Sequence, residues 1–204
     1  VNDAIYLGPD TLSFATFDGM SVLAGANSWN NDTSMKPIKC VVRNNQNKTM
    51  YGTEGRGFYF MDIAVNPFPV NYLPGTIIND IAIHPSTGHF WLAKANGLTK
   101  AVYNGTNFTF THYTMAQGLP SNNCRSVDIS PGGDIWIATD NGVSKYNGTS
   151  FINYKITEGL ISNNTNCVKF YGNNLWVGTQ LGISKYENLT TWKNFNNSFT
   201  PGLF

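Results

Sequence analysis

The chain has 204 residues, a formal net charge of +1 and only 12% charged residues, about half of the roughly 25% found in typical soluble domains. The net charge is near zero and Lys and Arg do not cluster in the sequence. The chain therefore lacks the positively charged surface that a nucleic-acid-binding protein needs. Hydrophobic residues make up 41% of the chain, which is enough for a core and argues against disorder. No apolar run approaches the ~18–20 residues of a membrane span, so the sequence predicts a soluble chain without membrane contact of its own.

Residues that favour turns dominate the composition. Asn occurs 27 times, Gly 20 times and Pro 9 times, whereas Glu occurs only at Glu54, Glu158 and Glu187. Helices favour Ala, Leu, Glu, Lys and Arg, while Asn and Gly favour turns. The composition therefore predicts an all-β fold with many tight turns.

A unit of about 40–45 residues recurs along the chain, as in repeat proteins. Its glycines, Gly57, Gly97, Gly142 and Gly182, are spaced 40, 45 and 40 residues apart. A tryptophan precedes each of the last three glycines by six residues, and Met50 takes its place in the earliest copy. In chain order, the repeats occupy approximately residues 1–30 (partial), 31–72, 73–117, 118–158 and 159–199 of a single domain, 1–204.

The first repeat is predicted to be incomplete. Ile5-Tyr6-Leu7 align with Ile135-Trp136-Ile137 of a second strand, so the first strand is missing. Residues 200–204 restart a Gly-Leu segment without supplying that strand. Two interpretations follow: a fragment of a longer propeller, which we favour, or a ring of five blades in which one has three strands.

The repeat at 118–158 displays its internal pattern, in which apolar residues alternate with a period of two. Strands are predicted at 125–129, 134–138, 143–146 and 150–156, separated by Gly-Gly and Asn-Gly turns that are typical of hairpins. Four antiparallel strands per repeat are typical of a β-propeller blade, with about five blades here. Trp136 is expected to wedge neighbouring blades apart. An up-and-down barrel, the alternative, predicts no grouping of strands in fours.

The segment GLPSNNCRSVDISPGGDIWIATDNGVSKYNG, residues 118–148, resembles the two-component regulator propeller repeat. The similarity is good in 159–187, weaker in 73–104 and faint before residue 60, with Ile161 where the family has Pro and Met50 where it has Trp. The resemblance implies a sensing module located in the periplasm or outside the cell, as in bacterial hybrid two-component sensors that respond to oligosaccharides. No cofactor is predicted for the chain.

The cysteines and histidines do not form a recognisable chemical site. Cys40, Cys124 and Cys167 are odd in number and lack CxxC spacing, so we expect buried, reduced, structural thiols. His84, His89 and His112 follow no metal or triad spacing. A His-centred site, as in lyase-type propellers, is the enzyme alternative; otherwise neither a catalytic residue nor a metal site is predicted.

In a propeller, the link between blades and the turn between second and third strands share one face of the disc. Amides, hydroxyls and a few charges on that face suit neutral polyhydroxylated ligands. The alternative is that these side chains cap turns by bonding the backbone. The candidate ligand-binding residues are Lys39, Asn79, Asp80, Asn122, Asn123, Arg125, Asp140, Asn163, Asn164 and Asn166.

Three functions are considered; the first is the prediction, and the other two are its alternatives. The first is a non-enzymatic sensing or binding module for an oligosaccharide or other small polar ligand, and the second is a protein–protein scaffold. The third is a lyase or hydrolase. The expected partners are an oligosaccharide and, through open blade edges, a second copy or the missing parts of a larger sensor.

Overall fold

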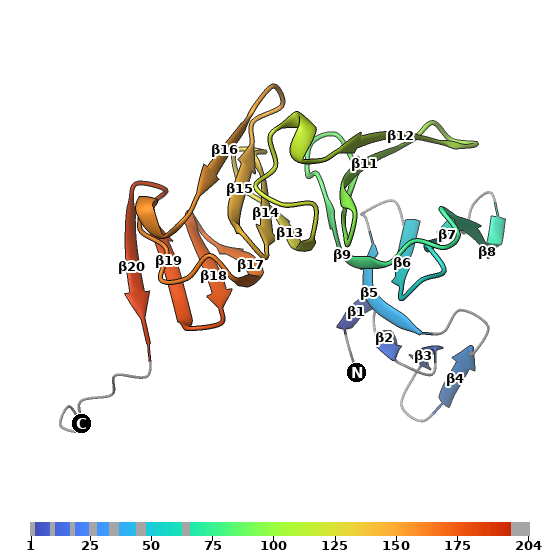
Figure 1. The fold of residues 1–204 in the computed structure, drawn as a ribbon. Helices are drawn as coiled ribbons and strands as arrows, with labels where there is room; N and C mark the ends of the chain where they lie inside the picture. Colours follow the sequence, from blue (N-terminus) through green and yellow to red (C-terminus); the bar gives the residue numbers. More distant parts are fainter. Residues whose placement is uncertain are drawn as a thin grey trace, which may run out of the picture. The chain divides into compact units, whose positions relative to one another are not determined.

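The computed structural model describes residues 3–8, 11–16, 19–24, 28–32, 37–43, 48–62 and 66–196. In these ranges the chain forms five four-stranded sheets, each made of strands that are consecutive in sequence (Figure 1). The predicted repetition of four-stranded blades is therefore confirmed. Two compact units are distinguished: Val1–Ala95 with Thr99–Thr111, and Asn96–Leu98 with His112–Phe204.

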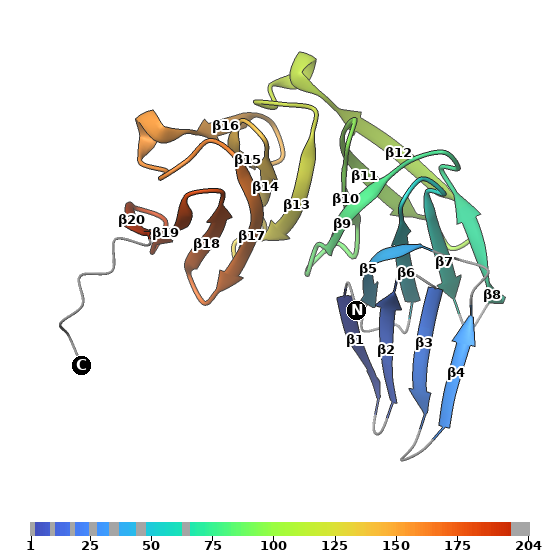
Figure 2. The same cartoon turned by 60° about the horizontal axis from the view of Figure 1, so that its bottom comes forward.

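The first unit contains two complete sheets and most of a third. The strands are β1 (Asp3–Gly8), β2 (Thr11–Thr16), β3 (Gly19–Ala24), β4 (Ser28–Asp32), β5 (Ile38–Arg43), β6 (Lys48–Thr53), β7 (Phe58–Asp62), β8 (Asn66–Tyr72), β9 (Ile78–Ile83), β10 (Phe90–Lys94), β11 (Gly97–Tyr103) and β12 (Phe108–Tyr113). The first strands of its blades, β1, β5 and β9, lie next to one another in chain order (Figure 2).

The second unit contains the last two sheets and both short 3-10 helices. The elements are η1 (Met115–Gln117), β13 (Cys124–Ile129), β14 (Ile135–Thr139), β15 (Gly142–Tyr146), β16 (Phe151–Tyr154), η2 (Ile156–Glu158), β17 (Thr165–Tyr171), β18 (Asn174–Thr179), β19 (Gly182–Glu187) and β20 (Thr191–Phe195). Here too the first strands, β13 and β17, lie next to each other.

Two strand predictions were wrong. The first blade is not missing a strand, because residues 5–7 lie in its first strand and the polar segment β4 pairs with β3, with Trp29 opposite Leu23. Ser28–Asp32 has no apolar alternation, so its pairing with β3 was not visible in the pattern. The strand predicted to reach Ile156 ends at Tyr154, and Ile156 begins η2. The restart at 200–204 lies outside the described residues.

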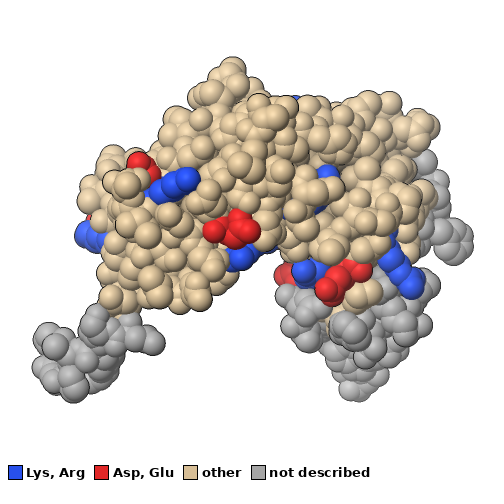
Figure 3. Space-filling model, in the orientation of Figure 1, with Lys and Arg blue, Asp and Glu red and all other residues tan. Residues whose placement is uncertain are grey.

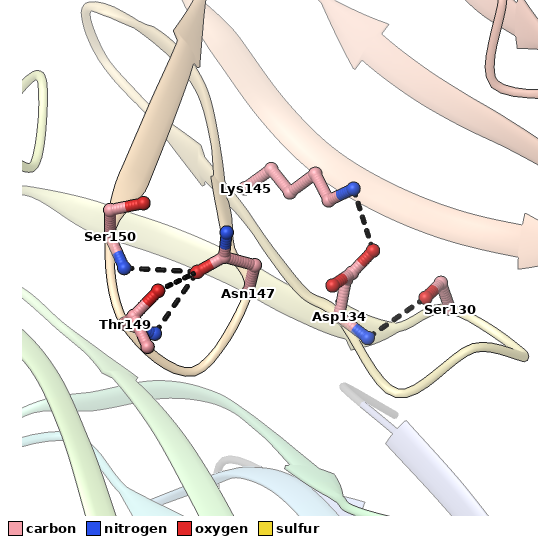
Figure 4. Close-up of polar contacts among 6 residues, drawn as sticks. All are labelled: Ser130, Asp134, Lys145, Asn147, Thr149 and Ser150. Carbon is pink, nitrogen blue, oxygen red and sulfur yellow. Dashed lines mark hydrogen bonds and ion pairs between the residues drawn. The ribbon is translucent and has the colours of Figure 1, made fainter.

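Side-chain hydrogen bonds form the turns that the Asn-rich sequence predicts. In the turn from β15 to β16, Asn147 Oδ1 accepts bonds from the backbone N–H groups of Thr149 (3.0 Å) and Ser150 (2.9 Å) (Figure 4). On the neighbouring β13–β14 turn, Asp134 N donates to Ser130 Oγ at 3.0 Å, and the Asp134 carboxylate pairs with Lys145 at 2.7 Å (Figure 4). Local bonds of this kind replace ladder bonds where the chain reverses.

Aromatic side chains fill the space between neighbouring blades within each unit. In the second unit, Trp136 on β14 is fully buried and stacks on Tyr154 of its own blade, with ring centroids 5.3 Å apart. It also contacts Phe170 and Tyr186 of the following blade. In the first unit, Phe108 on β12 packs in a cluster with Phe58 and Phe60 of the preceding blade and Phe90 of its own blade. The predicted wedge role of Trp136 is confirmed.

The cysteine prediction is correct for two residues and wrong for one. Cys40 and Cys124 are buried free thiols, whereas Cys167 is an exposed free thiol. Burial is also the main reason why the pKa of Cys40 is raised well above its usual value, and the nearby carboxylates of Asp80 and Asp3 raise it further. Cys167 lies on the opposite face of β17 from its neighbour Val168, which is buried against the preceding blade.

Candidate functional site

A β-bulge recurs near the start of the first strand in four of the five blades. The pairing of each first strand with the second strand skips one residue, and the skipped residues are Lys39, Asn79, Arg125 and Asn166. A bulge leaves the extra residue out of the ladder and turns its side chain in a new direction. Four polar or cationic residues therefore have the same place in four successive first strands, and all four were predicted as ligand-binding residues.

In the second unit, the bulge residue Arg125 reaches the next blade. Its Nη1 donates to Asn166 Oδ1 at 2.9 Å, to the Thr165 carbonyl at 3.1 Å and to Asn164 Oδ1. All three acceptors belong to the link and first strand of the following blade. Arg125 is half-buried, and its bonds are charge-assisted, which makes them stronger than bonds between neutral groups.

In the first unit, Lys39 and Asn79 repeat this arrangement. Lys39 Nζ donates to Asn79 Oδ1 at 2.9 Å, so a cation from one bulge again meets an amide from the next. Asp80 follows Asn79 on β9, and its Oδ1 accepts the backbone N–H of Ile81 at 2.8 Å. The bulge residues thus form cation–amide pairs within each unit.

The second Asn of each Ser-Asn-Asn link joins the link to the turn between the second and third strands. Asn123 Nδ2 donates to Asp140 Oδ2 at 3.0 Å, and in the next repeat Asn164 Nδ2 donates to Gln180 Oε1 at 2.9 Å. These bonds confirm that links and turns share one face within the second unit. Ser121 and Asn123 lower the pKa of Asp140 by hydrogen bonding and Arg125 by its charge, so the carboxylate stays ionised at neutral pH.

The first Asn of each Ser-Asn-Asn link has a different structural role. Asn122 Oδ1 accepts the backbone N–H of Met115 at 2.8 Å, and Asn163 Oδ1 accepts that of Ile156 at the same distance. Met115 and Ile156 are the first residues of η1 and η2, so these amides hold the 3-10 turns. Their bonding is that of turn caps, the alternative weighed for these residues.

Sequence reasoning did not identify Thr165 as a residue that positions this face. Thr165 is buried; its Oγ1 accepts the backbone N–H of Thr139 at 3.0 Å and donates to the Thr139 carbonyl at 2.7 Å. It thereby fastens the start of β17, next to the bulge residue Asn166, to the end of β14. A threonine at the start of a strand is so common that no sequence signal distinguishes it.

Two histidines lie in one turn of the third blade. His84 and His89 close the turn through a 2.9 Å backbone bond, and Ser86 Oγ lies 3.3 Å from His84 Nδ1. Partial burial, the charge of Lys100 and the neighbouring His84 lower the pKa of His89. His112 is exposed on β12. In the part of the chain that the structure describes, no group of three or more His, Cys, Asp or Glu side chains is placed to hold a metal.

Charged side chains form small, separate patches on an otherwise uncharged surface on the face shown in Figure 3. Within the described ranges no helix is long and apolar enough to cross a membrane. On this weakly charged surface, the bulge residues supply hydrogen-bond donors and acceptors at fixed positions.

The sequence comparisons found no relative: no family model matches the chain, and no curated protein matches it. Solved structures do match. The chain is similar to the extracellular domain of a proposed hybrid two component system, BT3049, from B. thetaiotaomicron (TM-score 0.84, 17% identity, 97% of this chain and 28% of that chain covered). It thus spans about a quarter of the length of that protein chain.

Two further structures broaden the comparison. The β-propeller domain of Cps50 (Swd1) from Myceliophteria thermophila matches with a TM-score of 0.63 and 13% identity, over 86% of this chain and 61% of that one. XC5397 from Xanthomonas campestris, a gluconolactonase, matches with a TM-score of 0.60 and 9% identity, over 83% and 65% of the two chains. Identities this low establish the fold alone. The chain has a β-propeller fold of about five four-stranded blades, a fold similar to that of the Cps50 propeller domain and of the BT3049 extracellular domain.

Proposed function

We propose that this chain is a non-enzymatic sensing module that acts outside the cytoplasm and binds an oligosaccharide or another small polar ligand. The observation that carries the proposal is the bulge repeated at Lys39, Asn79, Arg125 and Asn166. Bulges are over-represented next to functional sites, where they direct a side chain away from the sheet. The fold shared with an extracellular domain of a hybrid two component system supports the sensing function and the location.

The chemistry of the bulge residues favours a ligand rich in hydroxyl groups. Each unit pairs a cationic donor with amide groups that both donate and accept, as in Lys39 with Asn79 and Arg125 with Asn166. A sugar hydroxyl also donates and accepts, so it can bond both members of such a pair. The Asn123 amide and the ionised Asp140 add a donor and an acceptor on the same face.

The test is a screen of diverse oligosaccharides by thermal shift, followed by calorimetric titration of the hits. Asn166→Ala is expected to weaken binding of a hit about tenfold, since one bond to the ligand and the Arg125 contact are lost together. Lys169→Ala is the matched control, because Lys169 lies on the same strand with a side chain 78% exposed and is not a bulge residue. Its affinity for the hit is expected to equal that of the unaltered chain.

The outcomes separate the alternatives. A chain that no saccharide stabilises, but that retains a protein partner through the same face, would be a scaffold. Because XC5397 is a gluconolactonase, turnover of a gluconolactone is also measured. Turnover that disappears in the His84→Ala variant would contradict the non-enzymatic proposal.

A further inference from the structure

The two blades of the second unit allow a comparison of the same face with and without a covering sheet. The face of β13–β16 is covered by the following blade, and Trp136 and Val143 on it are fully buried. On the last blade, Ile183, the counterpart of Val143, is 45% exposed, and Trp176, the counterpart of Trp136, is only partly buried. Phe195 is 50% exposed, whereas its counterpart Tyr154 is partly buried. The strand registers support this correspondence, because Val143 pairs with Tyr154 as Ile183 pairs with Phe195.

The last blade already has the arrangement of a covered face. Trp176 stacks on Phe195 at 6.1 Å, as Trp136 stacks on Tyr154 at 5.3 Å. Lys185 Nζ lies 5.4 Å from the centroid of the Trp176 ring, as Lys145 Nζ lies 5.8 Å from that of Trp136. The side chains that a neighbouring blade would contact are therefore already positioned.

The contact of the last blade, β17–β20, with the face of β13–β16 shows which interactions such a face makes. Val168 and Val177 of the following blade are buried in the cluster that contains Trp136. Its first strand also donates backbone bonds, from Val168 N to Ser126 Oγ at 3.3 Å and from Phe170 N to Asp128 Oδ2 at 2.8 Å. Apolar packing and first-strand bonding thus act together at an inter-blade interface.

In the first unit, the contact between a blade face and the blade that follows it can be seen at Gly52. A Cβ added at Gly52 would lie 2.5 Å from Cys40 Sγ and 2.7 Å from Ile78 Cγ2, and Ile78 belongs to the following blade. A Cβ at Gly178, the corresponding position of the last blade, would meet only Cys167 Sγ, at 2.6 Å. The thiol position that is buried by a neighbouring blade at Cys40 is therefore open at Cys167.

We propose that the last-blade face, formed by Cys167, Trp176, Ile183 and Phe195, is a docking interface for one further four-stranded blade of the same repeat. The expected blade presents valine and aromatic side chains on its first strand, as β17 does with Val168 and Phe170. Continuity with the interface between β13–β16 and β17–β20 identifies this occupant. Exposed apolar surface that has a covered counterpart in the same molecule is the kind that marks an interface.

The test supplies such a blade. A second copy of residues 155–195, carrying Cys167→Ser within the copy, is inserted after Phe195 of the full chain. The rate of iodoacetamide alkylation of the original Cys167 is then measured, with the buried Cys40 and Cys124 as internal references. Alkylation of Cys167 is expected to slow at least about tenfold, because it now requires local opening of the new interface.

The matched control has the same insertion with Val168→Asp and Phe170→Asp in the copy, and Cys167 is expected to react at the rate of the unextended chain. Equal rates with both insertions would overturn the proposal. So would an unaltered inserted copy that remains protease-sensitive, because the proposed face is the surface on which that copy folds. Light scattering on the unextended chain is expected to show a monomer; a dimer with protected Cys167 would make a second copy the occupant and overturn it. No saccharide is present, so these results are independent of the proposed ligand.

Discussion

Replacing Trp136 with alanine is expected to lower the free energy of unfolding by about 3–5 kcal/mol. The side chain is fully buried between two blades and contacts Tyr154, Phe170 and Tyr186, so its removal leaves a cavity that rigid sheets cannot close. Urea unfolding followed by far-ultraviolet circular dichroism measures the loss without relying on tryptophan fluorescence.

Trp176→Ala is the matched control for this prediction. Trp176 has the same place in the last blade, with Lys185 over its ring as Lys145 lies over that of Trp136, but it is only partly buried. Its removal is expected to cost clearly less than that of Trp136. Equal losses in the two variants would mean that burial between blades is not what makes Trp136 important.

Gly142→Ala is expected to destabilise the chain by about 3 kcal/mol or more, a loss in the range that marks a specific steric conflict. Gly142 has φ of 108°, and a Cβ built there lies 2.5 Å from the carbonyl oxygen of Tyr154. Gly142 is the first residue of β15 and Tyr154 is the last residue of β16. The Tyr154 carbonyl lies so close to Gly142 that no side chain fits between them.

Gly148→Ala separates the steric conflict from the backbone conformation. Gly148 also has positive φ, at 97°, but nothing lies within 4 Å of a Cβ built there. Its replacement is expected to cost only about 1 kcal/mol, the cost of placing alanine in the left-handed region. Chemical unfolding of both variants measures the difference, and similar losses would contradict the close approach at Gly142.

The recurring glycines were readable from the sequence because one steric requirement recurs in every later blade. Cβ atoms at Gly57, Gly97 and Gly182 would meet the carbonyl oxygens of Tyr72, Tyr113 and Phe195, as at Gly142. This constraint acts over about fifteen residues within one blade and excludes every residue but glycine. The repeat of about 40–45 residues could therefore be predicted from the glycine spacing, and the four strands within it from the alternation of apolar residues and the turns.

Other features could not be predicted, because they depend on contacts with other strands and sheets, which the local sequence pattern does not reveal. Strand β4 has a polar sequence and is a strand through its pairing with β3. Cys167 resembles Cys40 in its local sequence, yet one thiol is exposed and the other is covered by the next blade. In both cases the neighbouring strand or sheet decides the outcome.

The candidate site shows the same division. Asn122 and Asn123 are adjacent and chemically identical, but the first holds a 3-10 turn while the second bonds Asp140. The sequence predicted that both lie on the face of links and turns. It did not reveal the bulge that sets Lys39, Asn79, Arg125 and Asn166 apart, since strand register depends on pairing geometry.

The most direct test of the bulge residues as a ligand-binding site is an NMR titration of side-chain amide signals with a saccharide that stabilises the chain. The side-chain amide signals of Asn79 and Asn166 are expected to shift in proportion to occupancy, while those of Asn122 and Asn163, which hold η1 and η2, are expected to stay unchanged. Shifts confined to Asn122 and Asn163, or no shift in any of the four during saturable binding, would contradict this prediction.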